Sequence, residues 1–579
     1  MTVTFVLTGE EFARCHHFCD RRLTAVNPRD QTADTAATLR SDATSTSFGS
    51  HMSISRRDAV SRLAALTAAL PLASRLPALT AANPLDGTIA DYQAGRRRGE
   101  WTAVEVTTHA LERCRDAGAR FRAIDVLDGD VALRAARGSD DRLRVGKTLG
   151  PLDGVPVFAK AIYDMNGLPT TGSSAEWARL FPEPVRRDAL EVARLRAAGA
   201  VILGKTAADD FAYRGNGTSS HTGQVLNPHD KTATKTPGGS SAGSAVAVVT
   251  GMAFAALGTD DGGSNRIPAQ FTGVVGMKPT FGLVPRTGVI PTWPYLDTHG
   301  PLARSVADAA LLLAAIVGPD ASDPLALTTG FDVAALATLR GDALNGVKLG
   351  VVDAHVPREQ MTAEALAAWD RVLVDLRAAG ATLEAFSPPV TRLTYRDAFN
   401  AAAKTRGDVA VDPDSPPPTA NALYRYFAGR ADDPRGAIRR GYSAYQKFYN
   451  VLPATYEECE PLFERPMTED PAGRSFARSR AEVVAQFESA MRSAGVAAMV
   501  YPTMPFNAPR AVDPWPNVRT ALGFGNWLGL PEVSVPAGYG ADGMPALNLS
   551  VVGLPGTDAR VLALAHAYEG RSRRFIAPR

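Results

Sequence analysis

Apolar positions in the first half of the globular chain alternate between two spacings. In residues 86–117 they recur at helical spacing, which predicts helix. Residues 155–159 and 200–203 are short apolar runs typical of buried strands, and residues 189–198 between them have the pattern of a helix that Gly199 ends. Because strands alternate with helices here, the pattern predicts an α/β fold.

The second half of the chain continues this alternation around a long helical segment. We find no internal repeat of fixed period and no sustained heptads, so one large α/β domain over residues 83–579 is the prediction. The further elements are a strand–helix–strand unit (347–353, 363–379 and 381–386), a mostly helical segment at about 396–494 with a proline-rich loop at 412–418, and late strands at 496–501 and 532–536.

The first 82 residues differ from the rest. Residues 1–51 are mixed and polar, so we expect a disordered leader, or upstream sequence from a mis-assigned start with Met52 as the true one. Residues 52–82 resemble a twin-arginine signal peptide, because Arg56 and Arg57 precede a weakly apolar stretch that ends in small residues. The expected location is exported, periplasmic or secreted. The alternative is a cytoplasmic protein in which this stretch is an amphipathic helix or a disordered arm.

Composition excludes several classes of function. Hydrophobic residues make up 45% of the 579, which is globular, and 62 basic residues against 60 acidic give a net charge of only +2. We therefore expect no nucleic-acid partner bound through bulk charge. Four cysteines exclude a disulfide scaffold, and the absence of a run of about 20 apolar residues argues against stable membrane insertion.

A cysteine–histidine cluster in the leader is the one hint of a metal. Its members, Cys15, His16, His17 and Cys19, are of the residue types that bind zinc. No second ligand pair lies nearby in the sequence, so we expect no metal and no cofactor.

Candidate chemistry lies in two glycine- and serine-rich loops, residues 236–244 and 258–268. Glycines allow backbone N–H groups to converge on one point, where they can hold an oxyanion. A flexible linker or a phosphate cradle is an alternative, but neither loop has the Lys-Ser/Thr ending of a P-loop.

A second alternative is the nucleophile elbow of α/β-hydrolases. Residues 239–243 fit G-x-S-x-G, which would make Ser241 the nucleophile, with His566 or His299 as its base. The elbow should follow a buried strand, however, and residues 229–236 are polar.

These loops resemble those of the amidase signature family. The resemblance covers residue 83 to the C-terminus and is strongest in block 238–280, with similar segments at 150–160, 297–305 and 530–538. It implies a large mixed β-sheet flanked by helices on both faces. It also implies a Ser-cisSer-Lys triad with Ser264 as nucleophile, Ser240 as the bridging serine after a cis peptide bond, and Lys160 as base. The implied oxyanion hole is the backbone N–H groups of Asp261, Gly262, Gly263 and Ser264.

The residues themselves agree with this chemistry. A serine hydroxyl needs a base, neither loop contains histidine, and lysine can serve if burial lowers its pKa. Lys160 ends an apolar strand and is flanked by Ala159 and Ala161. Asp260 and Asp261 are expected to cap the loop rather than to act as acid or base.

Some positions depart from the family pattern, and others are candidates for substrate contact. Ala242, Asn265, Gln270 and residues 544–548 depart from it, and we expect Asn265 and Gln270 to alter the pocket wall. Substrate contacts are expected from Gly238, Gly239, Tyr163 and Trp293, among aromatic residues that also include Tyr213, Tyr295 and Trp527.

The sequence leaves three functions open. The first is a stand-alone amidase, of EC 3.5.1 type, that hydrolyses a carboxylic or peptide amide as a monomer or homodimer. The alternatives are the glutaminase subunit of a tRNA-dependent amidotransferase and a catalytically silent binding protein on the same fold.

Overall fold

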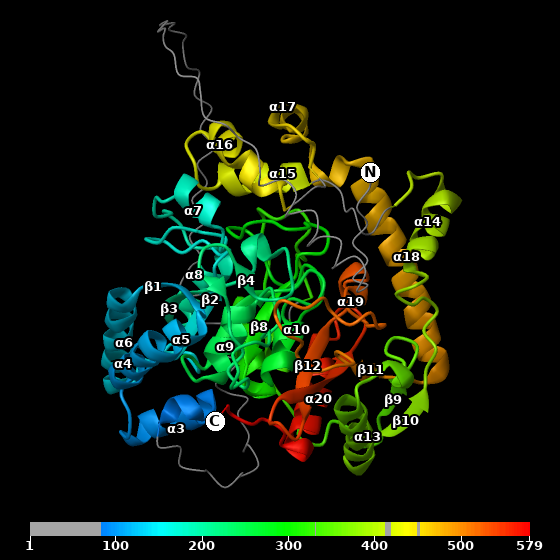
Figure 1. Cartoon of the computed structure of the whole chain (residues 1–579), viewed down its shortest axis with the longest axis horizontal. Helices are drawn as coiled ribbons and strands as arrows, with labels where there is room; N and C mark the ends of the chain where they lie inside the picture. The colour runs from blue at the N-terminus through cyan, green and yellow to red at the C-terminus, as the bar shows by residue number, and fades with distance from the viewer. Residues whose placement is uncertain (1–82, 331, 412–418, 449–451, 579) are drawn as a thin grey trace, which may run out of the picture.

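The computed structural model describes residues 83–330, 332–411, 419–448 and 452–578 (Figure 1). The leader predicted at 1–51, its zinc alternative, the signal peptide predicted at 52–82 and the loop at 412–418 lie outside the described residues, so these expectations stay predictions.

One large mixed sheet organises the described chain. Its order is β1-β3-β2-β6-β8-β7-β12-β13-β11-β9-β10, with parallel pairs such as β2·β3 and β2·β6 and antiparallel pairs such as β6·β8 and β12·β13. The predicted fold class is therefore confirmed. The strands are β1 (Ile124–Leu127), β2 (Pro156–Lys160), β3 (Val201–Thr206), β6 (Ala255–Thr259), β7 (Val275–Lys278), β8 (His299–Ala303), β9 (Lys348–Val351), β10 (Thr382–Ala385), β11 (Ala498–Pro502), β12 (Glu532–Tyr539) and β13 (Pro545–Val552).

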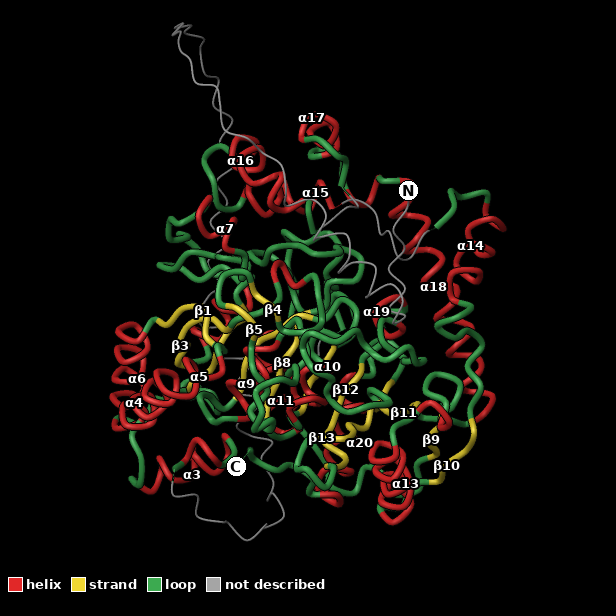
Figure 2. The backbone as a smooth tube through the Cα atoms, in the orientation of Figure 1, coloured by secondary structure: helices red, strands yellow, loops and turns green. Residues whose placement is uncertain are grey.

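Helices cover both faces of this sheet. Every residue of β2, β3, β6, β7, β8, β11 and β13 is buried. Because successive strand residues point to opposite faces, neither face of these strands can be open to water. Figure 2 shows the strands crossing the middle of the molecule with helices around them. The packing helices include α6 (Gly129–Arg144), α8 (Leu190–Ala197), α9 (Ala242–Val249), α10 (Arg266–Thr272), α11 (Val306–Ile316), α13 (Ala363–Ala378) and α20 (Asp558–Ser572).

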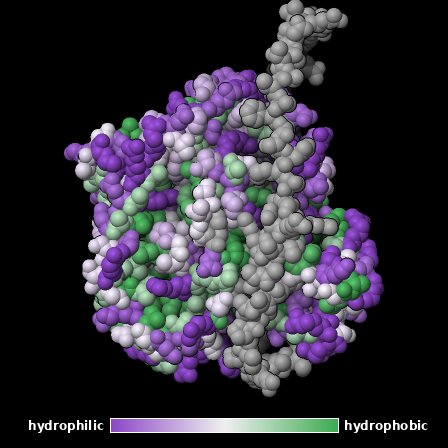
Figure 3. All heavy atoms as spheres, turned by 180° about the vertical axis from the view of Figure 1, so that it is seen from behind, coloured by the Kyte–Doolittle hydropathy of each residue, from purple (hydrophilic) through white to green (hydrophobic). Residues whose placement is uncertain are grey.

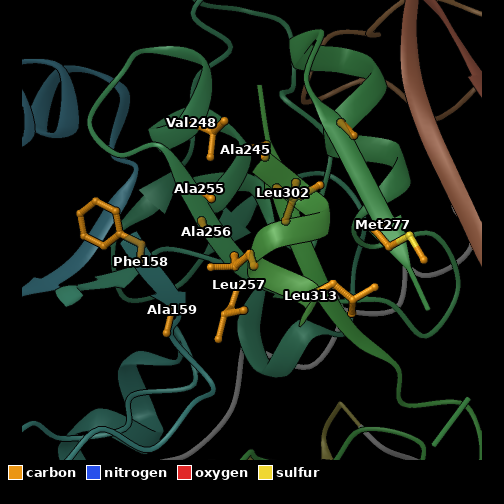
Figure 4. Packing of buried hydrophobic residues seen from close by; sticks show 14 of the residues in the cluster. Phe158, Ala159, Ala245, Val248, Ala255, Ala256, Leu257, Met277, Leu302 and Leu313 are labelled. Carbon is orange, nitrogen blue, oxygen red and sulfur yellow. The ribbon is translucent and has the colours of Figure 1, made fainter. Parts of the chain in front are cut away.

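The central strands carry the core. Phe158 of β2, Leu257 of β6 and Leu302 of β8 are fully buried, and Figure 4 shows side chains of these strands gathered with Leu313 of α11. Burial of apolar area on this scale is the main source of stability. Figure 3 shows hydrophilic residues over much of one outer face, with hydrophobic positions interspersed. Among the helices that the structure describes, none is both long enough and apolar enough to cross a membrane.

The helical pattern of residues 86–117 forms two main helices, α3 (Ile89–Arg98) and α4 (Ala103–Arg113). Gly99 ends α3 in the left-handed conformation, with φ of 75°. Thr102 then starts α4 with a capping box, because its hydroxyl accepts the Glu105 N–H while the Glu105 carboxylate accepts the Thr102 N–H. The glycine that ends α3 and the capping box that starts α4 therefore explain why the predicted helical stretch forms two helices.

The described part of residues 396–494, where the sequence predicts a mostly helical segment, consists mainly of α-helices. In Figure 1 it runs along the top and right-hand side of the molecule. Tyr445 from this segment donates a hydrogen bond to the carbonyl of Pro291, and Tyr426 donates one to Asp164 at 3.0 Å. The segment thus packs against loops of the sheet-containing core. Its helices are α14 (Tyr395–Arg406), α15 (Thr419–Ala428), α16 (Pro434–Gln446), α17 (Tyr456–Cys459) and α18 (Pro471–Ala494).

Candidate active site

The candidate site lies where β2 and β6 end. Lys160 is the last residue of β2 and Thr259 the last of β6, and the two strands are parallel neighbours. Carboxyl ends of parallel neighbours meet at the same edge of a sheet, which is where α/β proteins place their ligands. Both glycine-rich loops adjoin this edge, because one leads into α9 and the other follows β6.

Lys160 is completely buried and bonded to two hydroxyls. Its Nζ donates to Ser240 Oγ at 2.7 Å and to Thr259 Oγ1 at 2.8 Å. Burial lowers the pKa of Lys160 to about 8, and each nearby carboxyl group opposes this shift when it is ionised. A lysine with such a pKa is neutral often enough near neutral pH to accept a proton.

The first loop places Ser240 in hydrogen-bonding contact with Lys160. The Gly239–Ser240 peptide bond is cis, and Ser240 is fully buried. A Cβ at Gly239 would collide with the Asp209 carboxylate and would come within 2.8 Å of the Gly217 nitrogen, so the loop requires glycine there.

Ser241 connects the two loops. Its N–H donates to the Ser264 carbonyl at 3.1 Å, and its hydroxyl donates to Asn265 Oδ1 at 3.0 Å. No histidine of the described chain is hydrogen-bonded to it. His299 instead contacts Glu191 at 2.6 Å, and residues 229–236 form no strand. The nucleophile-elbow alternative therefore has no geometric support.

The second loop presents Ser264, which is 8% exposed, just before α10. Asp260 organises this loop because it accepts the N–H groups of Gly263 at 2.7 Å and Asn265 at 3.1 Å. Burial opposes charge on Asp260, but Arg266 outweighs it and holds the pKa of that carboxyl well below its usual range. The expected capping role of Asp260 is confirmed.

Asp261 does not cap the loop, and that expectation is wrong. Both of its carboxyl oxygens are buried and accept no hydrogen bond from a backbone N–H in the part of the chain that the structure describes, and the carboxyl lies against that of Asp297. Burial, together with the charge of Asp297, raises the pKa of Asp261 well above its ordinary value. The N–H groups of Gly263 and Asn265 in this loop are bonded to Asp260 instead.

A buried ionic network that the sequence did not indicate supports the Ser264 loop. Arg266 contacts Asp260 at 2.9 Å and Glu532 at 2.7 Å, and also donates to Asn526 Oδ1 at 2.7 Å. Asn526 in turn donates to the carbonyl of Asp260 at 2.6 Å. These bonds join α10 to β12 and α19 (Phe524–Trp527), so late segments of the chain fix the loop. Their only sequence signal was the arginine directly after the Ser-Asn pair.

The two departures expected to alter the pocket wall, Asn265 and Gln270, are buried and hydrogen-bonded to neighbouring segments. Asn265 is fully buried and donates to the Met277 carbonyl at 3.0 Å. Gln270 is fully buried as well, and it bonds the backbone of Met504 and Phe506. Both side chains join strands and loops, and an effect on the pocket wall stays a prediction.

The predicted substrate contacts lie near the site but have structural partners. Tyr163 is fully buried and donates to the Gly258 carbonyl at 3.1 Å, while the Trp293 backbone N–H donates to Asp297 at 2.6 Å. Trp527 stacks on Tyr395 with ring centroids 3.6 Å apart. Gly238 and Gly239 belong to the Ser240 loop itself. A substrate contact for any of them stays a prediction.

The hydrogen bond expected between the two serines of the predicted triad is not formed. The described structure has no hydrogen bond between Ser240 Oγ and Ser264 Oγ, although the Ser241–Ser264 backbone bond holds the loops side by side. Such bonds are often long before substrate arrives. Within the described ranges, no group of three or more histidine, cysteine, aspartate or glutamate side chains is placed to hold a metal.

The mixed sheet places a buried lysine and two serine-containing loops at one edge, so the protein is of the α/β class with a candidate active site there. Comparison with known proteins makes this specific. A family model described as Amidase matches residues 105–562, so the chain belongs to the amidase family.

Curated relatives and solved structures point to two different members. A glutamyl-tRNA(Gln) amidotransferase subunit from Symbiobacterium thermophilum is 35% identical over 492 residues, 81% of this chain and 94% of the relative. Its namesake in Ralstonia nicotianae is 33% identical, with the same coverage. Native peptide amidase from Stenotrophomonas maltophilia superposes with a TM-score of 0.71 at 30% identity, covering 86% of this chain and 99% of the other.

Proposed function

We propose that the protein hydrolyses a carboxylic amide to the acid plus ammonia or amine through an acyl-enzyme on Ser264. The observation that carries the proposal is the contact of Lys160 with Ser240 in a fully buried site. A buried lysine beside a serine, next to a glycine-rich serine loop, supplies base and nucleophile without histidine.

The first half of the reaction moves two protons and forms one bond. Neutral Lys160 takes the Ser240 hydroxyl proton as Ser240 takes that of Ser264, and the Ser264 oxygen bonds to the amide carbon. The carbonyl oxygen becomes an oxyanion that the N–H groups of residues 261–264 hold. Protonation of the nitrogen through Ser240 then breaks the C–N bond, and the amine leaves with the proton that Ser264 lost.

The second half uses water as the nucleophile. Lys160 and Ser240 now take a proton from water, whose oxygen bonds to the acyl carbon. The Ser264–acyl bond breaks, the proton returns to the Ser264 oxygen, and the acid departs. Donors already placed for the first oxyanion serve the second one too, which is the advantage of a preorganised loop.

For the substrate, the curated relatives favour the glutaminase-subunit hypothesis over the stand-alone amidase. Both reported relatives carry the name of an amidotransferase subunit and align over nearly their whole length. Under this hypothesis the chain hydrolyses glutamine and passes ammonia to a partner protein. The likeness to peptide amidase, at 30% identity and nearly complete coverage, supports the stand-alone amidase as the second candidate.

The nucleophile is tested by labelling the full chain with a fluorophosphonate and measuring its intact mass. A single adduct is expected on the wild type and on Ser241→Ala, and none on Ser264→Ala. The Ser241→Ala variant is the matched control, because it removes a neighbouring serine hydroxyl. An adduct that persists in Ser264→Ala would move the nucleophile elsewhere, and none on folded wild type would favour the silent binding protein.

The substrate is tested by ammonia release. Glutamine turnover that requires partner proteins and charged tRNA would support the first candidate. Turnover of peptide amides or simple amides by the chain alone would support the second. Location bears on the same choice, since a tRNA-dependent enzyme must stay where tRNA is. Fractionation of cells expressing the full chain, with Arg56 and Arg57 both changed to lysine as the control, tests the predicted export.

A further inference from the structure

Two carboxyl side chains, Asp261 and Asp297, lie opposite each other beside the candidate base. β6 and β8 are antiparallel with Thr259 opposite His299. The Asp260 N–H donates to the Thr298 carbonyl at 2.7 Å, so the pairing continues one residue past the strands. The next residues in this register are Asp261 and Asp297, and side chains at such opposed positions have Cβ atoms about 5 Å apart.

The surroundings of the two carboxyls are unequal. Asp297 is 5% exposed, and its two oxygens accept the backbone N–H groups of Thr292 at 3.0 Å and Trp293 at 2.6 Å. That arrangement suits a carboxylate. Asp261 is 4% exposed, and neither of its oxygens has a donor among the described residues. A buried carboxylate without donors is costly, whereas a protonated carboxyl could donate to its neighbour.

We propose that Asp261 holds a proton which it donates to the Asp297 carboxylate, so that this pair presents one negative charge, not two, to Lys160. Asp261 is then a positioning residue for the base. The inference rests on the proposed function only in taking Lys160 as that base. The proton itself follows from the opposed carboxyls and their unequal donors.

The proton matters for two reasons. An ionised Asp261 would stabilise the ammonium form of Lys160, because attraction to Asp261 is the largest effect that opposes its deprotonation. Its charge would also lie beside its own backbone N–H, which belongs to the predicted oxyanion hole, and would oppose the oxyanion. A neutral Asp261 removes both obstacles.

Other charged and titratable groups face this pair. Asp260 lies next along the loop and remains ionised through Arg266. Arg286 carries a positive charge that interacts with Asp297. Tyr163 and Tyr445 lie near Asp261, and burial raises the pKa of each hydroxyl well above its ordinary value, so both stay neutral. The remaining carboxylate near Lys160 is Asp209, which accepts the N–H groups of Gly217 and Thr218, each at 3.0 Å.

The test compares two isosteric variants of the full chain, Asp261→Asn and Asp209→Asn. The rate of fluorophosphonate addition to the protein is followed against pH by intact mass. If Asp261 is already neutral, Asp261→Asn leaves the midpoint attributed to Lys160 where it is. Asp209→Asn removes a real charge, so its midpoint falls by about one pH unit. A comparable fall in Asp261→Asn would overturn the proposal.

An infrared measurement reads the proton without any reaction. At pH 8 the wild type minus Asp261→Asn difference spectrum is expected to contain a carboxylic-acid C=O band. Its replacement by a carboxylate band would overturn the proposal. If the acid band is present while labelling has no midpoint that depends on Lys160, the carboxyl pair stands and the proposed function fails. Thermal unfolding of both variants checks that they fold.

Discussion

Removing the Thr259 hydroxyl should shift the pH dependence of the reaction downward. The ammonium form of Lys160 donates to Ser240 and Thr259, so Thr259→Val deletes one of its two acceptors while preserving the shape of the side chain. Losing an acceptor destabilises the charged form and lowers the pKa further. The sign is therefore fixed by which form makes the bond.

The magnitude follows from the same contact. A hydrogen bond to a charged group contributes about 1.5–3 kcal/mol, and one pKa unit corresponds to about 1.4 kcal/mol. Local rearrangement around the lysine offsets part of this lost free energy. We therefore expect the pKa of Lys160 to fall by about one unit from its value of about 8. At pH 7 the neutral fraction would then rise from about one tenth to about one half.

The assay is the rate of fluorophosphonate addition to Ser264 between pH 5.5 and about 9.5, a range that brackets the lysine titration. Wild type should rise by about tenfold per pH unit and level off near pH 8, and Thr259→Val should level off about one unit lower. Thr206→Val is the matched control. Thr206 is as buried as Thr259 and lies on β3, which is next to the Lys160 strand, but its hydroxyl bonds Ala159 and Ser244 rather than the lysine amine. A midpoint that stays in place or rises in Thr259→Val would refute Lys160 as the base.

Three further predictions concern stability. Lys160→Met should abolish labelling and raise the free energy of unfolding at pH 7 by about 1–3 kcal/mol. A buried lysine with a lowered pKa destabilises the folded protein below that pKa, and this cost disappears as the pH rises. Thermal unfolding of both proteins at pH 7 and pH 10 measures the gain and its loss. Arg266→Leu should cost about 3–5 kcal/mol because Asp260 and Glu532 lose their buried partner, and a loss under 1 kcal/mol by denaturant titration would contradict this. Thr102→Ala should cost about 1 kcal/mol through the lost capping box, whereas Thr102→Ser should cost less.

Local signals in the sequence predicted much of the framework. The apolar runs at 155–159 and 200–203 are β2 and β3, and the helix predicted at 363–379 is α13. Strands β6 and β8 were not predicted, because Gly258, Gly300 and Pro301 interrupt short segments that carry no alternation. Both strands are buried on both faces, which removes the period-two pattern that identifies a strand.

By itself, then, the sequence determined the α/β class, the two serine loops and the lysine at the end of a strand, because each of these features is a pattern of residues that are neighbours in the sequence. Tertiary structure alone decided which groups meet. Arg266 bonds Glu532 across 266 positions, and Asp261 faces Asp297 only because β6 and β8 pair in one register. The same pairing turns Asp261 from an expected cap into a buried carboxyl without a donor. Strand order and burial set these contacts, and neither is encoded in local spacing.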